Sequence, residues 1–129
     1  SSDLTLYVKS GIGKLSAYCG VVSAGVVSVA GIAFLKGDSK DIIENTLVNG
    51  LASLSGIVCD GAKPSCAGKI AISLDGAFMG YKQARLNKNY QKGDGLVAYS
   101  VDETIRSIGA VAQGMKETDV VILNEMLKH

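Results

Sequence analysis

Hydrophobic residues recur at helical spacing along almost the whole chain, with turn residues between the runs. The first run extends from about Leu4 to Ala17, with Asp3 at the position of an N-cap. The second, Gly20 to Leu35, is rich in valine and small residues and ends at Lys36-Gly37, a usual C-terminal signal. Because it continues for about sixteen residues without a turn signal, we expect a buried helix rather than a strand.

The same pattern predicts two further helices before a long loop. One begins at the Asp38-Ser39 cap and runs to Leu54 or Ile57. The other covers Ala67 to Leu86 and becomes basic towards its end, where cations favour the helix dipole. The stretch from Asn87 to Tyr99 is an extended loop, either a solvated connector or a lid over a site.

Two helices are expected to close the chain. The run Ser100-Val101-Asp102-Glu103 has the form of a capping box at a helix start. Residues 118–127 place Val121, Ile122, Met126 and Leu127 on one side, which indicates a terminal docking helix. The sequence therefore predicts a compact all-α domain over residues 1–129, with a cysteine-bearing loop between two helices.

Composition narrows the range of partners. Thirteen basic and twelve acidic side chains nearly balance, and there is no tryptophan, so neither nucleic acid nor an anionic membrane is expected as a partner. The run from Leu15 to Leu35 is uncharged and nominally long enough to span a membrane, but its serines and glycines weaken the hydropathy. No signal peptide is evident, and we expect a cytoplasmic protein.

Glycine is unusually frequent, with sixteen residues of this type. Within helices glycine is destabilising relative to alanine, so we expect these positions to serve close helix crossings or bends. The positions within predicted helical runs or at their ends are Gly20, Gly25, Gly31, Gly50, Gly56, Gly68, Gly76 and Gly80.

Three cysteines are the only sulfur nucleophiles, and the last two bracket the segment Cys59-Asp60-Gly61-Ala62-Lys63-Pro64-Ser65-Cys66. An odd number cannot be fully paired, which leaves a metal site, a reactive thiol or buried thiols. Six residues separate Cys59 from Cys66 and thirty-nine separate Cys19 from Cys59, unlike zinc-ribbon or ferredoxin spacings. Spacing alone leaves these alternatives open.

Four segments read together carry a family resemblance. Residues 13–20 (GKLSAYCG), 59–67 (CDGAKPSCA), 101–106 (VDETIR) and Gly114-Met115 closely resemble the C-terminal part of the L-cysteine desulfidase family, which is related to the iron-sulfur L-serine dehydratases. The similarity covers nearly the whole chain with its motifs in the same order. The CDGAKPSC run is its most specific part.

The resemblance implies a [4Fe-4S] enzyme in which Cys19, Cys59 and Cys66 are the cluster ligands and one iron stays open for substrate. The implied reaction converts L-cysteine to pyruvate, ammonia and sulfide; an L-serine dehydratase is the alternative. The family's base is expected in an N-terminal part that this chain lacks, so that part is an implied partner and the chain alone should be inactive. We expect protein prepared in air to lack an intact cluster. Assembly into a homo-oligomer is also compatible with the sequence.

Two residues of the cysteine segment suit the recognition of a substrate carboxylate. Lys63 could pair with the carboxylate, and Asp60 could orient the substrate or the lysine. Bracing of the loop is an equally good explanation for both. A hypothesis from another class also stands: a helical structural or interaction domain whose thiols are buried packing residues.

Overall fold

The computed structural model describes residues 18–129, and these residues form five α-helices. In chain order they are α2 (Gly20–Leu35), α3 (Lys40–Leu54), α4 (Pro64–Arg85), α5 (Val101–Gly114) and α6 (Lys116–Leu127). An isolated antiparallel bridge joins Tyr18 to Val58, and the described part contains no strand. The prediction of an all-α domain is confirmed. The helix expected over Leu4 to Ala17 lies outside the described residues.

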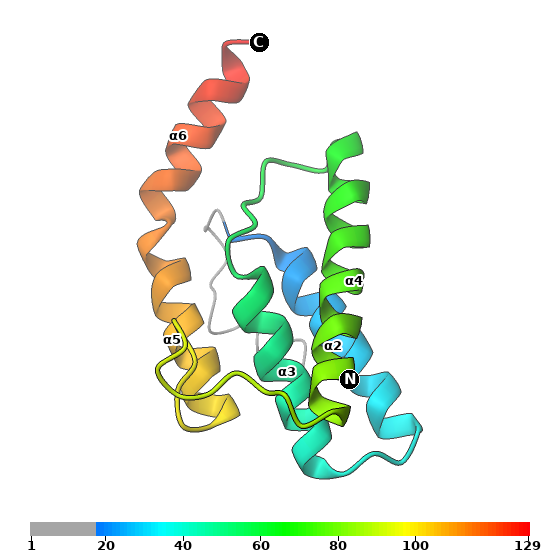
Figure 1. The fold of residues 1–129 in the computed structure, drawn as a ribbon. Helices are drawn as coiled ribbons and strands as arrows, with labels where there is room; N and C mark the ends of the chain where they lie inside the picture. Colours follow the sequence, from blue (N-terminus) through cyan, green and yellow to red (C-terminus); the bar gives the residue numbers. More distant parts are fainter. Residues whose placement is uncertain (1–17) are drawn as a thin grey trace.

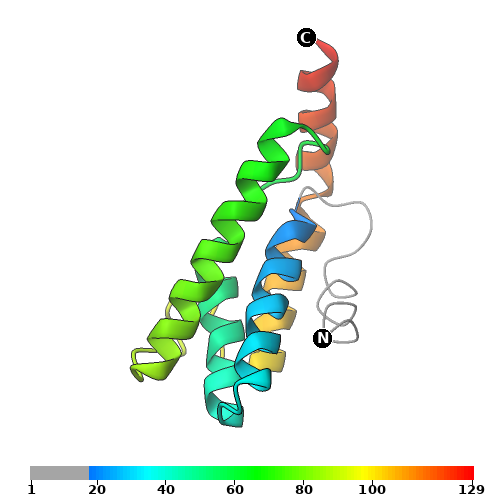
Figure 2. The same ribbon diagram turned by 90° about the vertical axis from the view of Figure 1, so that its right-hand side faces the viewer.

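Helices α2, α3 and α4 pack side by side and alternate in direction, as Figures 1 and 2 show. Helix α5 lies against α3, and α6 continues from the end of α5 away from the other helices. With this arrangement the start of α2, the end of α3 and the start of α4 share one end of the domain (Figure 1). That end holds all three cysteines.

Local signals in the sequence fix most helix ends. After α2 the chain passes through Gly37 with φ of 78°, and Asp38 N–H donates to the Ala33 carbonyl over 3.1 Å. Ser39 caps α3 by accepting from the Ile42 N–H, and Ser100 caps α5 by accepting from the Glu103 N–H. These ends lie where the sequence predicted them.

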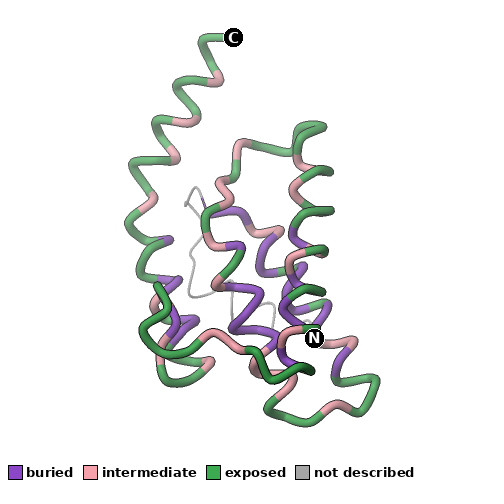
Figure 3. The backbone as a smooth tube through the Cα atoms, in the orientation of Figure 1, coloured by how far each residue is buried: buried purple, intermediate pink, exposed green. Residues whose placement is uncertain are grey.

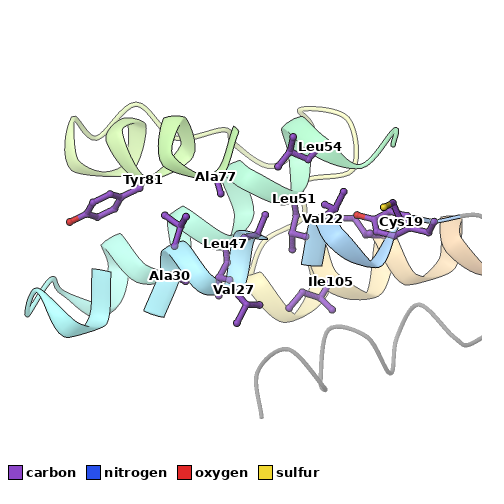
Figure 4. Close-up of a cluster of buried hydrophobic side chains, with 14 of the residues drawn as sticks. Cys19, Val22, Val27, Ala30, Leu47, Leu51, Leu54, Ala77, Tyr81 and Ile105 are labelled. Atoms are coloured by element: carbon purple, nitrogen blue, oxygen red, sulfur yellow. The ribbon is translucent and has the colours of Figure 1, made fainter. Parts of the chain in front are cut away.

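The core lies between α2, α3 and α4, with α5 closing one side, and its valines, leucines and alanines are almost completely buried (Figures 3 and 4). Glycines allow α3 to approach both α4 and α2 closely. A Cβ on Gly80 would lie 3.0 Å from the Gly50 nitrogen, and one on Gly50 would lie 2.9 Å from Val26. The predicted close crossings are thus present at these positions, whereas Gly56 and Gly68 have no neighbour within 4 Å.

Two predicted boundaries and one predicted contact need correction. Helix α4 begins at Pro64 rather than Ala67, because proline at the first helical position loses no hydrogen bond. The last helix begins at Lys116 rather than at residue 118. It does not dock on the described bundle, since none of its residues is buried (Figure 3).

The membrane alternative receives no support from the described helices. None of those within residues 18–129 is both long enough and apolar enough to cross a bilayer.

Candidate functional site

Cys19 and Cys59 are brought together by a short pairing of two distant segments. Tyr18 and Val58 form the antiparallel bridge, and the Cys19 N–H donates to the Ile57 carbonyl over 3.1 Å. Cys19 is only 3% exposed and packs at the end of the core beside Val22 (Figure 4), whereas Cys59 is exposed. One thiol is therefore fixed in the core opposite Ile57, and the other lies at the surface, one residue beyond the bridge at Val58.

A lysine that the sequence did not single out joins this pairing to α4. The Lys69 ammonium donates to the Val58 carbonyl over 2.8 Å and to the Asp60 carboxylate over 2.5 Å. Its side chain is only 20% exposed, which is unusual for lysine unless the ammonium is paired. One helical residue thus holds the residues on both sides of Cys59.

Lys69, Asp60 and Tyr18 have shifted pKa values. The hydrogen bond from Lys69 lowers the pKa of the Asp60 carboxyl, and the same bond raises the pKa of Lys69. Negative charge on Cys19 and Cys59 makes smaller contributions to that rise. Burial, with the charge of Cys19 added, raises the pKa of Tyr18.

Cys66 occupies a different position from the one predicted for it. It is the third residue of α4, half-buried, and its N–H donates to the Lys63 carbonyl over 2.8 Å. Lys69 follows it three positions later on the helix, so the two side chains are neighbours on the helix surface. The CDGAKPSC segment is therefore a loop up to Lys63 and a helix from Pro64 onward.

The protein-family model described as "Serine dehydratase alpha chain" matches residues 1–124. This chain belongs to the serine dehydratase alpha chain family. The UPF0597 proteins of Finegoldia magna and Desulfitobacterium hafniense are each 52% identical to it, over 126 and 128 residues. A UPF0597 protein of Caldanaerobacter subterraneus is 43% identical over 127 residues.

The match to these relatives covers nearly all of this chain but only part of theirs. It includes 97 to 98% of the present chain and 30% of each relative. This serine dehydratase alpha chain domain therefore spans about a third of the length of the curated relatives it matches. No solved structure matches the sequence.

The thiols of this serine dehydratase alpha chain domain suit an iron-sulfur cluster in their chemistry. Thiolate is the preferred ligand of such clusters, and the three cysteines lie on segments at the same end of the domain. Within residues 18–129 no group of three His, Cys, Asp or Glu side chains is arranged to hold a single metal ion.

The two residues predicted for carboxylate recognition are placed differently from each other. Asp60 is engaged by Lys69 rather than by Lys63. Lys63 is the N-cap residue of α4 with an exposed side chain, beside the segment that carries the thiols. Its recognition role stays a prediction, whereas the structure gives Asp60 a bracing contact.

The structure also bears on two other interpretations of the sequence, the buried packing thiols and the loop as a lid. Buried packing thiols describe Cys19 but not the exposed Cys59. The Asn87–Tyr99 loop is not a lid over the thiols, because it is bound to the middle of α3 near the opposite end of the domain (Figure 1). A polar hollow of about 440 Å³ under this loop is lined by Glu44, Tyr90 and Tyr99 among others, and it too lies away from the cysteines.

Proposed function

We propose that this chain is the cluster-binding domain of a [4Fe-4S]-dependent lyase, with L-cysteine desulfidase as the activity and Cys19, Cys59 and Cys66 as ligands. The observation that carries the proposal is the pairing of the two distant segments that carry Cys19 and Cys59, with the Lys69 ammonium bonded to the residues on both sides of Cys59. Membership of the serine dehydratase alpha chain family supports lyase chemistry.

The residues of the chain have distinct roles in this proposal. Cys19 is held by the core and by its backbone bond to Ile57, so it provides a fixed thiolate. Cys59 is exposed and Cys66 half-buried, so both are more accessible to a substrate than Cys19. When bound, the cluster supplies an open Lewis-acidic iron that polarises the leaving group of the substrate. Lys63, exposed at the start of α4, pairs with the substrate carboxylate.

L-Serine dehydratase activity is the second candidate, favoured by the family description itself. The two activities differ in the leaving group, which is sulfide from L-cysteine and hydroxide from L-serine. Both yield pyruvate and ammonia. Because the chain spans about 30% of its relatives, lyase activity is best tested with the chain joined to the remainder of a full-length family member.

Each of the three cysteines should be required for iron binding. Changing Cys19, Cys59 or Cys66 to serine should remove most of the iron after anaerobic reconstitution with iron and sulfide, because a hydroxyl is a poor ligand for iron. Ser65→Ala, at an exposed position beside Cys66, is the matched control and should keep its iron. Iron and sulfide analysis with visible absorption provides the measurement, followed by pyruvate and sulfide release from each substrate.

Two outcomes would contradict the proposal. Full iron content in any one cysteine variant would remove that residue from the ligand set. An unmodified chain that takes up no iron, together with three thiols that resist alkylation, would favour the structural-domain hypothesis instead.

A further inference from the structure

Lys69 is the most buried of the lysines whose ion pairs the structure describes, and the proposed reaction does not use it. Its side chain is 20% exposed, compared with 86% for Lys40 and 64% for Lys128. Its two hydrogen bonds go to Val58 and Asp60, which are the sequence neighbours of Cys59 on either side. These two hydrogen bonds fix the Val58–Asp60 segment, which belongs to no helix.

Without Lys69, little else would hold this segment on α4. Val58 is attached to the other side through its bridge to Tyr18, and Cys59 itself is exposed. Gly61, with φ of 94°, then turns the chain towards the start of α4. The segment therefore lies between the Tyr18 bridge on one side and the Lys69 ammonium on the other.

The ammonium also places a positive charge beside Cys59, where it is paired with the Asp60 carboxylate. It has three N–H donors, of which two are used by Val58 and Asp60. These two bonds place the ammonium between the sequence neighbours of Cys59, so its charge lies beside that thiol. A cluster held by three thiolates carries net negative charge, and reduction adds another, so a cation at this position favours the reduced form.

We propose that Lys69 is a positioning residue of the thiol site: it ties the Val58–Asp60 segment to α4, and its charge lies beside Cys59. The anchoring role concerns the protein without metal, and the charge role rests on the proposed function. The two roles are tested separately.

The anchoring role is tested on the metal-free chain by hydrogen exchange of the backbone amides of residues 57–60. Lys69→Met should speed this exchange about tenfold or more, which corresponds to loss of about one charged hydrogen bond. Lys69→Arg should restore most of the protection. Lys82→Met, at an exposed position of the same helix, is the control and should leave exchange unchanged. Asp60→Asn removes the negative charge that pairs with the Lys69 ammonium, and it should also speed exchange.

The charge role is tested by the reduction potential of the reconstituted cluster. Lys69→Met should shift the potential to a more negative value, and Lys69→Arg should not, a difference that a purely structural role would not produce. Unchanged exchange in both Lys69→Met and Asp60→Asn would overturn the anchor, and an unchanged potential in Lys69→Met would overturn the charge role. If the unmodified chain binds no cluster, the proposed function fails while the exchange result still decides the anchor.

Discussion

At the scale of single residues, Asn49 shows how one polar side chain can organise three elements. It is completely buried in α3, where its amide nitrogen donates to the Gly80 carbonyl of α4 and to the Asn89 side chain, each over 3.1 Å. Its amide oxygen accepts from the Tyr90 N–H over 3.1 Å. All of the groups on this amide therefore have partners, as a buried polar group requires.

Removing this amide should be costly. Asn49→Ala leaves the Gly80 carbonyl and the Tyr90 N–H without their partner, and we expect a loss of about 3 kcal/mol in the free energy of unfolding. Asn124→Ala, at an exposed position of α6, should change it by less than about 0.5 kcal/mol. Urea denaturation followed by circular dichroism measures both. A loss of less than about 1 kcal/mol in Asn49→Ala would show that water replaces the missing bonds.

Residue-scale reasoning from sequence found the cysteines but missed both Asn49 and Lys69. Cysteine is conspicuous because it is rare and chemically distinct, whereas one asparagine in a helix has no local mark of burial. Lys69 is a cation in the apolar first half of α4, three residues after Cys66, and this was the available signal. Its partners at Val58 and Asp60 depend on the pairing of Tyr18 with Val58, which no local pattern predicts.

At the scale of helices, close approach of α3 and α4 depends on the absence of side chains at facing glycines. A Cβ on Gly80 would meet the Gly50 nitrogen at 3.0 Å and the Asn49 Cβ at 3.1 Å. Backbone atoms of a packed helix cannot move aside as the tip of a side chain can. The distance between these helices also determines whether Asn49 reaches the Gly80 carbonyl.

Replacing either of two glycines of α4 by alanine should therefore change the stability of the domain in opposite directions. Gly80→Ala should destabilise the domain by about 1–3 kcal/mol, because the clash with α3 outweighs the gain in helix propensity. Gly68→Ala has no neighbour within 4 Å and should stabilise it by up to about 1 kcal/mol. Thermal and urea unfolding of the two variants gives the comparison. Stabilisation by Gly80→Ala would mean that the two helices can separate at no cost.

Helix boundaries could be predicted where the end signal is local. The packing of the helices against one another could not. Gly37, Ser39 and Ser100 each mark an end by their own chemistry, and the structure agrees with them. The predicted start at Ala67 left Pro64 outside α4, although proline is favourable at the first helical position. For α6, the apolar pattern identifies a face but does not specify what that face contacts.

At the scale of the whole molecule, α6 stands apart from the other helices (Figure 1). It exposes Val120, Val121, Leu123 and Leu127, and none of its residues is buried. Met126 approaches Gly61, with its methyl carbon 3.6 Å from the position of an added Cβ. Stability of the described core thus depends on α2 to α5, while α6 lies beside the thiol segment without contributing to the core.

Deleting α6 should consequently leave the fold intact. A chain ending at Met115 keeps the contact of that residue with the core, and its free energy of unfolding should stay within about 0.5 kcal/mol of the full value. A chain ending at Arg106 is the matched control, because it also removes Ile108 and Ala112 from the core and should lose several kcal/mol or fail to fold. Urea unfolding of the three chains makes the comparison. A loss above about 2 kcal/mol on removal of α6 alone would show that this helix stabilises the bundle despite its exposure.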